Sequence, residues 1–329
     1  MKGGTTMSAV VRKIGLLACV MCLVSACSVS ASASLGTGRK AGVASATPAF
    51  TASLPLPRAI AKRLPAGIFY LLAGTNPASY NLWEVVNTGN EIELTHNSEG
   101  YGISAFGASP AGIVMADAAN GYDQLARLTA NGVSFLKDGS GSTPAINSAG
   151  QICYSLSPDG NKQPYFELVL KDSLSATGRV IYRQKADIVS NVWGPGNAIA
   201  MVVGGHYPGT TGPTPRLVIQ KAGTSRTVAT GLGKDLSDVI WGTKAAGLAL
   251  GTWSGTGRVI YGHGKQYTLP HGWNPAAWNA SGTLLLVWGP SKKIGLWSPL
   301  RPQAIQVIGT ISKGVTIGQS AWLNRPAKL

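Results

Sequence analysis

Short apolar segments recur along residues 65–329 at a nearly regular interval. Each segment pairs a Leu or Val with a second apolar residue. Successive segments start 43, 43, 49, 42 and 37 residues apart, at Leu82, Leu125, Leu168, Leu217, Val259 and Leu296. A Gly followed by an apolar run precedes every segment by 12 to 21 residues. Apolar runs of this length, bounded by Gly and turn residues, predict β-strands rather than helices.

Two further positions complete the repeat. Large apolar residues recur at the same interval, at Phe106, Ile146, Trp193, Trp241, Trp278 and Trp322. A fourth short run ends each unit, at Glu91–Leu94, Val133–Leu136, Arg179–Arg183, Arg226–Ala229, Gln266–Leu269 and Ala304–Ile308. Four short strands in about 43 residues are typical of one blade of a β-propeller. The absence of helix-length runs with a period of 3.6 residues excludes a helical solenoid.

The order of the strands also predicts how the ring closes. The first unit begins at Gly67 without a preceding Trp strand, whereas the last strand, Ile317–Trp322, has no unit after it. We expect this last strand to complete blade one, which removes the open sheet edges that would invite aggregation. The sequence therefore predicts an all-β fold, a single β-propeller over 65–329 with six four-stranded blades. Seven blades is the alternative count.

One repeat element resembles a known family. The run Trp278–Leu285 (WNASGTLL) is similar to the W-S-P-D-G repeat of TolB-like and WD-repeat-like propellers, and Trp193–Gly196 is a weaker version. The Asp of that repeat is missing from every blade, and the literal Ser157–Gly160 (SPDG) stands ten residues away from the equivalent position. We interpret Ser157–Gly160 as a turn between strands, because Pro and Asp-Gly are turn residues. The resemblance implies the propeller architecture alone.

The N-terminus has the features of an export signal. Basic residues at positions 12 and 13 precede the apolar run Ile14–Ala26, which is too short to span a bilayer but suits a signal peptide. Val24–Cys27 (VSAC) resembles a bacterial lipobox, which implies cleavage before Cys27 and acylation of its thiol. An ordinary secretory signal cut after an Ala is the alternative. We predict a signal peptide over 1–26, a lipidated Cys27 with a flexible tether over 27–64, and anchoring at the extracytoplasmic face of the cell membrane.

The tether prediction rests on composition, since residues 28–64 are rich in Ser, Ala, Thr and Gly, and residues 27–64 contain no acid. After processing, Cys153 would be the one remaining cysteine, and its apolar neighbours predict a buried small side chain. The formal net charge of +15 divides into +3 for 1–26, +5 for 27–64 and +7 for 65–329. A surplus of seven without clustering disfavours a nucleic-acid partner, which would require a basic stripe with aromatic residues.

Candidate catalytic and metal-binding residues are scattered. The four histidines, His96, His206, His263 and His271, form no H-E-x-x-H pair. The aspartates near Gly-rich turns lack the order of a calcium loop. We therefore expect no catalytic set, no metal site and no cofactor, and interpret the histidines as solvated loop residues.

Two groups of residues are candidates for binding. Propellers commonly bind ligands at the mouth of the central channel, and the polar residues just before the large apolar positions are Ser104, Asn191, Asp238, Asn274 and Gln319. Three tryptophans fall outside the repeat and are candidates for surface anchors: Trp253, Trp273 and Trp288. The insert His206–Pro215 is a candidate loop over one face.

These features predict a membrane-anchored lipoprotein whose propeller is a non-catalytic platform for a protein partner at the cell envelope. A propeller that binds glycan, cell-wall material or a small ligand is the alternative. That alternative is motivated by the three tryptophans and the polar channel mouth. A third hypothesis is an enzyme, a lyase or hydrolase, built on the propeller scaffold. Fold alone does not decide among the three.

Overall fold

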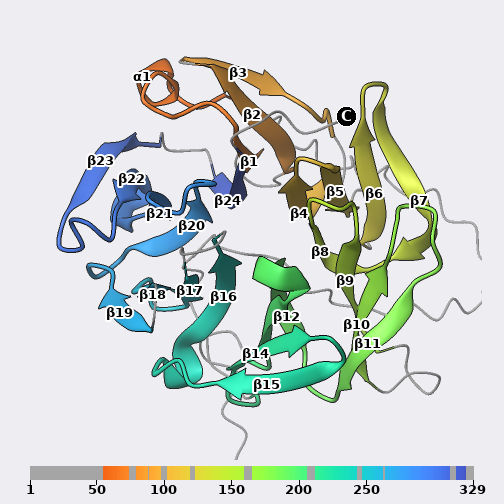
Figure 1. Cartoon of the computed structure of the whole chain (residues 1–329). Coiled ribbons are helices and arrows are strands. Elements are labelled where there is room, and N and C mark those ends of the chain that lie inside the picture. The colour runs from red at the N-terminus through yellow and green to blue at the C-terminus, as the bar shows by residue number, and fades with distance from the viewer. Residues whose placement is uncertain are drawn as a thin grey trace, which may run out of the picture.

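The protein is a ring of six four-stranded antiparallel sheets arranged around a central axis (Figure 1). The computed structural model describes residues 55–73, 79–87, 89–97, 102–118, 123–158, 165–205, 212–242, 247–261, 264–311 and 316–323. Within these residues the sole α-helix is α1 (Arg58–Ala61), followed by 24 strands and three short 3-10 helices. The all-β six-bladed propeller predicted from the repeat is confirmed.

Each blade is described from its innermost to its outermost strand. Blade 1 contains β24 (Thr316–Trp322), β1 (Ile68–Ala73), β2 (Asn81–Asn87) and β3 (Asn90–Glu93). Blade 2 contains β4 (Ile103–Ser109), β5 (Gly112–Asp117), β6 (Gln124–Thr129) and β7 (Gly132–Ser140). Blade 3 contains β8 (Ser142–Ile146), β9 (Ile152–Leu156), β10 (Phe166–Lys171) and β11 (Arg179–Gln184).

The other three blades follow the same order. Blade 4 contains β12 (Ile188–Trp193), β13 (Ile199–Val203), β14 (Arg216–Lys221) and β15 (Thr224–Val228). Blade 5 contains β16 (Leu236–Trp241), β17 (Leu248–Thr252), β18 (Arg258–Tyr261) and β19 (Lys265–Thr268). Blade 6 contains β20 (Asn274–Trp278), β21 (Leu285–Trp288), β22 (Lys293–Trp297) and β23 (Ile305–Thr310).

The ring closes as the sequence predicts. The last strand, β24, pairs antiparallel with the first, β1, and the pairing runs from Ile68 opposite Trp322 to Ala73 opposite Thr316. The backbone N–H of Leu323 donates to the carbonyl of Gly67 at 2.8 Å, just beyond the end of this ladder. Blade 1 is therefore built from both ends of the domain, and we call this pairing the ring seam.

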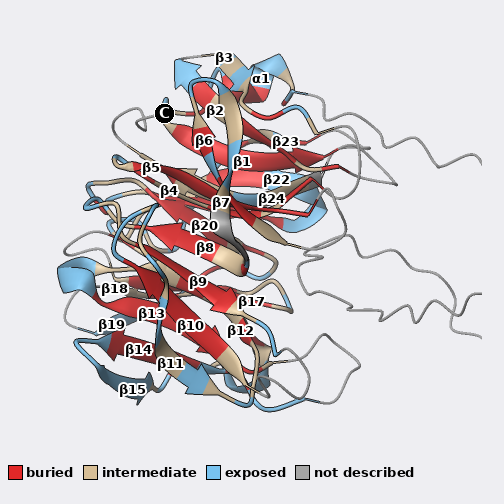
Figure 2. Ribbon diagram, turned by 90° about the vertical axis from the view of Figure 1, so that its right-hand side faces the viewer, coloured by how far each residue is buried: buried red, intermediate tan, exposed pale blue. Residues whose placement is uncertain are grey.

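The middle strands of the blades are the most buried and the outer strands the least (Figure 2). Every residue of β1, β5, β13 and β17 is buried, whereas β15 is exposed over four of its five residues. The second strand of a blade is apolar on both faces because a neighbouring blade covers each of them, as in sheets buried on both sides. Buried apolar clusters fill the gaps between neighbouring blades. One of them contains Phe69 and Leu71 of blade 1 and Phe106 of blade 2.

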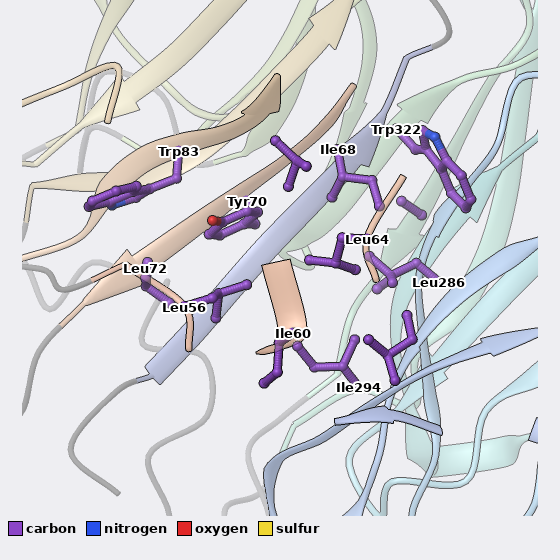
Figure 3. Packing of buried hydrophobic residues seen from close by; sticks show 14 of the residues in the cluster. Leu56, Ile60, Leu64, Ile68, Tyr70, Leu72, Trp83, Leu286, Ile294 and Trp322 are labelled. Carbon is purple, nitrogen blue, oxygen red and sulfur yellow. The ribbon is translucent and has the colours of Figure 1, made fainter. Parts of the chain in front are cut away.

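The expected flexible tether over 27–64 is wrong for its last ten residues. Leu56, Ile60 and Leu64 are 4, 3 and 2 % exposed and belong to one apolar cluster with Tyr70 and Trp322 (Figure 3). The composition of residues 28–64 predicts a segment with too little apolar surface to fold. Of the three buried residues, Ile60 lies in α1, whereas Leu56 precedes the helix and Leu64 follows it, and packing against the blades brings their side chains into one cluster. The folded part includes residues 55–64, and residues 27–54 lie outside the described residues.

This N-terminal segment, residues 55–64, closes the outer gap between blades 6 and 1. The helix α1 packs against β23, and Arg63 donates from Nη1 to the carbonyl of Ile308 at 3.1 Å. The backbone N–H of Leu56 donates to the carboxylate of Glu91, which also accepts the hydroxyl hydrogen of Tyr70. We refer to residues 55–64 as the N-terminal clasp.

Two other expectations concern connections between strands. Ser157–Gly160 stands between β9 and β10 in the sequence, but residues 159–160 are outside the described residues, so its interpretation as a turn stays a prediction. Most of the insert His206–Pro215 also falls outside them, between β13 and β14. No helix in the described part of the chain is long and apolar enough to cross a membrane.

Candidate functional site

The five polar residues predicted for the channel mouth all lie on innermost strands. Ser104 is on β4, Asn191 on β12, Asp238 on β16, Asn274 on β20 and Gln319 on β24. Asn191 is buried, Gln319 is exposed and the other three are half-buried. The repeat therefore placed these residues on innermost strands, and their side-chain partners show what each of them contacts.

Three of the five join neighbouring blades through hydrogen bonds of their side-chain amides. Gln319 of blade 1 accepts through Oε1 from the backbone N–H of Phe106 in blade 2 at 2.8 Å. Asn191 of blade 4 donates through Nδ2 to the carbonyl and hydroxyl oxygens of Thr143 in blade 3, both at 2.7 Å. The amide of Asn274 in blade 6 accepts from the N–H of Thr252 in blade 5 at 3.1 Å and donates to its carbonyl at 2.9 Å.

The remaining two are Asp238, a carboxylate that also joins two blades, and Ser104, which binds a carboxylate within its own blade. The hydroxyl of Ser190 in blade 4 donates to Asp238 in blade 5, and the backbone N–H of Val239 donates to the same Oδ1 at 2.7 Å. Ser104 donates to Asp123 at 2.6 Å within blade 2. Polar side chains on innermost strands thus fasten blades to one another, because buried donors and acceptors need partners. Their first role in this structure is to stabilise the ring.

Burial raises the pKa of the Asp238 carboxyl, while the hydrogen bonds from Ser190 and Val239 lower it in part. A carboxyl whose pKa is higher in the folded chain contributes most to stability below its unfolded pKa of about 3.9. That contribution is lost as the pH rises through the folded pKa. The same cause raises the pKa of Asp123.

Replacing Asp238 by Asn should keep or raise the melting temperature at pH 7, because the amide oxygen still accepts both hydrogen bonds and cannot ionise. The gain over the wild type should shrink as the pH falls toward 4, where the wild-type carboxyl is protonated. Each kcal/mol corresponds to about 2–4 °C in domains approaching this size. Thermal unfolding between pH 4 and 8 measures the difference. A variant that is least stable, relative to the wild type, at pH 7 would contradict the prediction.

The three unrepeated tryptophans are not a shared surface. Trp273 is 7 % exposed, so its expected surface position is wrong. Its ring packs against Gly289 and Gly295, where a Cβ would lie 2.7 and 2.9 Å from ring atoms. Trp253 and Trp288 are half-buried, and Trp288 packs against the cluster that contains the N-terminal clasp. Spacing alone could not separate these packing residues from surface anchors.

Cys153 is buried, as its apolar neighbours predict, and burial raises the pKa of its thiol. Its Sγ donates to Oδ1 of Asn191 at 3.2 Å, which adds a polar contact between blades 3 and 4. The predicted acylation site, Cys27, lies outside the described residues.

Two polar contacts involve the loop between β17 and β18 of blade 5. His271 and Thr256 contact each other through Nδ1 and Oγ1 at 3.1 Å, and both carboxylate oxygens of Asp235 accept hydrogen bonds from Ser254. The carboxylate therefore faces Ser254 rather than the imidazole, which differs from a nucleophile–base–acid relay. His96 is exposed and lies 3.3 Å from Glu93. His206 and His263 are outside the described residues, among which no cluster of His, Cys, Asp and Glu could hold a metal ion.

Sequence reasoning missed three exposed apolar side chains on the outer parts of blades 1 and 2: Val86, Ile92 and Phe135 are 37, 43 and 53 % exposed. We call these residues the rim patch. Ile92 of β3 pairs with Glu84, and Phe135 of β7 pairs with Ala126. Directly paired residues share one face of a sheet.

The rim patch faces the gap between blades 1 and 2. Leu82, two residues before Glu84 and so on the same face of β2, belongs to the same buried cluster as Ala126. Ile92 and Phe135 therefore extend the two walls of this interface toward solvent. Burial raises the pKa of the Glu84 carboxyl, which stands on the same wall. The alternation of outer strands could have suggested the patch, since an apolar residue facing the solvated end of a blade is unexpected.

Comparison with known proteins gives the fold. No family model and no curated protein sequence matches the chain. A chain of the crystal structure of a nidogen/laminin complex is 13 % identical over 78 % of this chain and 98 % of its own length, with a TM-score of 0.56. TolB from Acinetobacter baumannii is 13 % identical over 78 % of this chain and 66 % of the TolB chain, with a TM-score of 0.58. The domain is therefore a six-bladed β-propeller with the TolB-like fold.

Proposed function

We propose that the chain is an exported lipoprotein, anchored through an acylated Cys27, whose propeller is a non-catalytic platform for a protein partner at the cell envelope. The rim patch is the observation that carries the platform proposal. Polar groups of the channel are engaged between blades, whereas three large apolar side chains are exposed on the outside of blades 1 and 2. Exposed apolar side chains that border one gap between blades favour protein contact.

The chemistry of the rim patch also restricts the partner. Ile92 and Phe135 offer apolar surface, and Glu84 offers a half-buried carboxyl on the same wall. A partner segment with apolar side chains and one Lys or Arg would cover the patch and pair with Glu84. Aromatic anchors such as Phe135 are the side chains that commonly dominate binding energy in protein interfaces.

The anchoring part of the proposal is supported by the position of Cys27 directly after the apolar run of the signal. Changing Cys27 to Ser should move the protein from the membrane fraction to the soluble exported fraction. The fractions are measured by immunoblotting after cell fractionation. Unchanged retention in the membrane would contradict anchoring through Cys27.

The platform is tested by cross-linking and affinity purification from native membranes at low and high salt. The wild-type protein and Val307→Ser, which alters an equally exposed side chain (47 %) on the outer strand of blade 6, should capture the same partner. Their capture of the partner should persist at high salt, because apolar contacts are not screened by salt. The double variant Ile92→Ser/Phe135→Ser removes those contacts and should lose the partner at both salt concentrations. Equal capture by the double variant, or capture that high salt abolishes, would contradict the proposal.

A further inference from the structure

Blades 4 and 5 border an open groove with a volume of about 410 Å³. This size falls within the range of about 300–1,000 Å³ found for ligand pockets. Its apolar side is formed by Trp241, Ala198 and Ile219, and its polar side by Lys221, Arg226 and the hydroxyl residues between them in sequence. We call this site the blade 4/5 groove. It lies on the opposite side of the ring from α1 (Figure 1).

The turn at Gly194–Asn197 shapes the groove. A Cβ on Gly194 would lie 2.2 Å from ring atoms of Trp241, so the absence of a side chain lets the indole of blade 5 pack against blade 4. A Cβ on Gly196 would lie 3.3 Å from Nζ of Lys221, which brings the ammonium group over the same turn. Gly196 and Asn197 have φ values of 65° and 57°, in the left-handed region. Two glycines of one turn therefore make room for an aromatic ring and a cation.

The pairing of β14 with β15 places the polar side. Ile219 pairs with Arg226, and Lys221 pairs with Thr224, so all four share the face of blade 4 that meets blade 5. The hairpin turn between the strands has φ values of 47° at Ala222 and 81° at Gly223, as a tight two-residue turn requires. The turn fixes Lys221 and Arg226 on one wall, facing Trp241.

The cationic side chains of Lys221 and Arg226 have no bonding partner in the part of the chain that the structure describes. Neither Lys221 nor Arg226 has a side-chain hydrogen bond or ion pair with the described residues. Other arginines are engaged: Arg183 pairs with Glu167 at 2.6 Å, and Arg258 donates to the carbonyl of Thr230 at 2.9 Å. The described residues that line the groove include no carboxylate. The groove thus offers two free positive charges beside an aromatic surface.

From this arrangement we infer that the blade 4/5 groove binds an acidic saccharide, a chain of pyranose units that carry carboxylates. The apolar face of a sugar ring would stack on Trp241, and the carboxylate would accept hydrogen bonds from Lys221 and Arg226, whose guanidinium matches carboxylate geometry. Ser225 and Thr224 would bind ring hydroxyls. An open groove, rather than a closed cavity, suits a chain that extends beyond the site. The site is separate from the rim patch and independent of the anchoring at Cys27.

The inference is tested by isothermal titration calorimetry with the purified full-length chain in detergent. Trigalacturonate supplies rings with carboxylates, its methyl ester supplies the rings without charge, and citrate supplies carboxylates without a sugar ring. We expect saturable binding of trigalacturonate, and binding of the methyl ester and of citrate that is weaker by about tenfold or more.

The variants separate a site from general charge attraction. The double variant Lys221→Gln/Arg226→Gln should bind trigalacturonate about tenfold or more weakly. The control Arg179→Gln/Lys293→Gln, which removes two exposed cations from other blades, should bind it as the wild type does. All four side chains are exposed, so unchanged unfolding midpoints are expected and are measured in parallel.

Several outcomes would overturn the inference. The first is no saturable binding of trigalacturonate, and the second is equal loss of binding in the two double variants. Binding of citrate as tight as that of trigalacturonate would show an anion site without sugar recognition. Binding of phosphatidylglycerol vesicles that depends on Lys221 and Arg226, without binding of trigalacturonate, would assign the groove to an anionic lipid headgroup.

Discussion

Replacing Gly67 by Ala should open the ring at its seam and remove a large part of the stability of the domain. Gly67 has a φ of 78°, and a Cβ at this position would lie 2.0 Å from the carbonyl oxygen of Leu323. The obstacle is backbone rather than a flexible side chain, so β24 would have to move. Gly67 also accepts the hydrogen bond from Leu323 and donates one to the carbonyl of Val85 at 2.7 Å. Both ends of the domain therefore depend on this residue.

The expected loss combines two costs. A left-handed conformation costs a non-Gly residue about 1–2 kcal/mol, and displacement of the closing strand adds the apolar contacts of Trp322. Together they amount to several kcal/mol of a total of about 5–15 kcal/mol. Urea unfolding followed by tryptophan fluorescence measures the loss.

Gly223→Ala is the matched control for this variant. Gly223 has a φ of 81°, nearly that of Gly67, and no atom lies within 4 Å of the position of its Cβ. It should therefore lose only the conformational cost of about 1–2 kcal/mol. The difference between the two variants isolates the steric contact at the ring seam. Equal losses of stability in the two variants would mean that the ring seam accommodates the added methyl group without further destabilisation.

The architecture could be predicted from the sequence because a propeller repeats one pattern six times. The recurring positions from Phe106 to Trp322 are on innermost strands in all six blades, and the missing strand of the first repeat is supplied by the last. Each repeat is weak evidence alone, since short apolar runs fit strands or buried helices. Six such repeats at one interval favour a single architecture, the β-propeller, in which neighbouring blades cover each other.

The use of individual polar residues could not be predicted in the same way. The repeat correctly placed Asn274 and Gln319 on innermost strands, but a hydrogen-bond partner across a blade interface depends on three-dimensional register. Trp241 illustrates the same limit. Its recurrence predicted packing between blades, and it does pack against blade 4, yet it also lines a groove with Lys221 and Arg226. Those two cations come from a hairpin more than 14 residues earlier in the sequence.

The predicted domain boundary at residue 65 is wrong because composition does not reveal where the folded segment begins. Residues 28–64 share one Ser- and Ala-rich, acid-free composition, whereas the change from tether to folded segment occurs within it. Leu56, Ile60 and Leu64 carry the signal, as three large apolar residues spaced four apart in an otherwise small and polar segment. A helix of four residues has little stability by itself, so packing against blades 6 and 1 decides its formation.

Removing the N-terminal clasp should therefore destabilise the propeller strongly. A chain of residues 65–329 lacks the burial of Leu56, Ile60 and Leu64, each worth about 1.5–3 kcal/mol when fully buried. It also leaves Glu91 without the N–H of Leu56, in a site where burial raises the pKa of the carboxyl. We expect it to unfold at a much lower urea concentration than a chain of residues 55–329, or to aggregate through the uncovered gap between blades 6 and 1.

A pair of point variants shows whether the clasp acts through its buried side chains. Ile60→Ala in the chain of residues 55–329 should cost about 2–5 kcal/mol, because the Ile60 side chain fills the space above Gly309. Ala59→Ser, one residue earlier on the exposed side of α1, should change the free energy of unfolding by less than about 0.5 kcal/mol. If the chains with and without residues 55–64 were equally stable, this segment would instead belong to the tether. In that case the seam between β1 and β24 alone would close the ring.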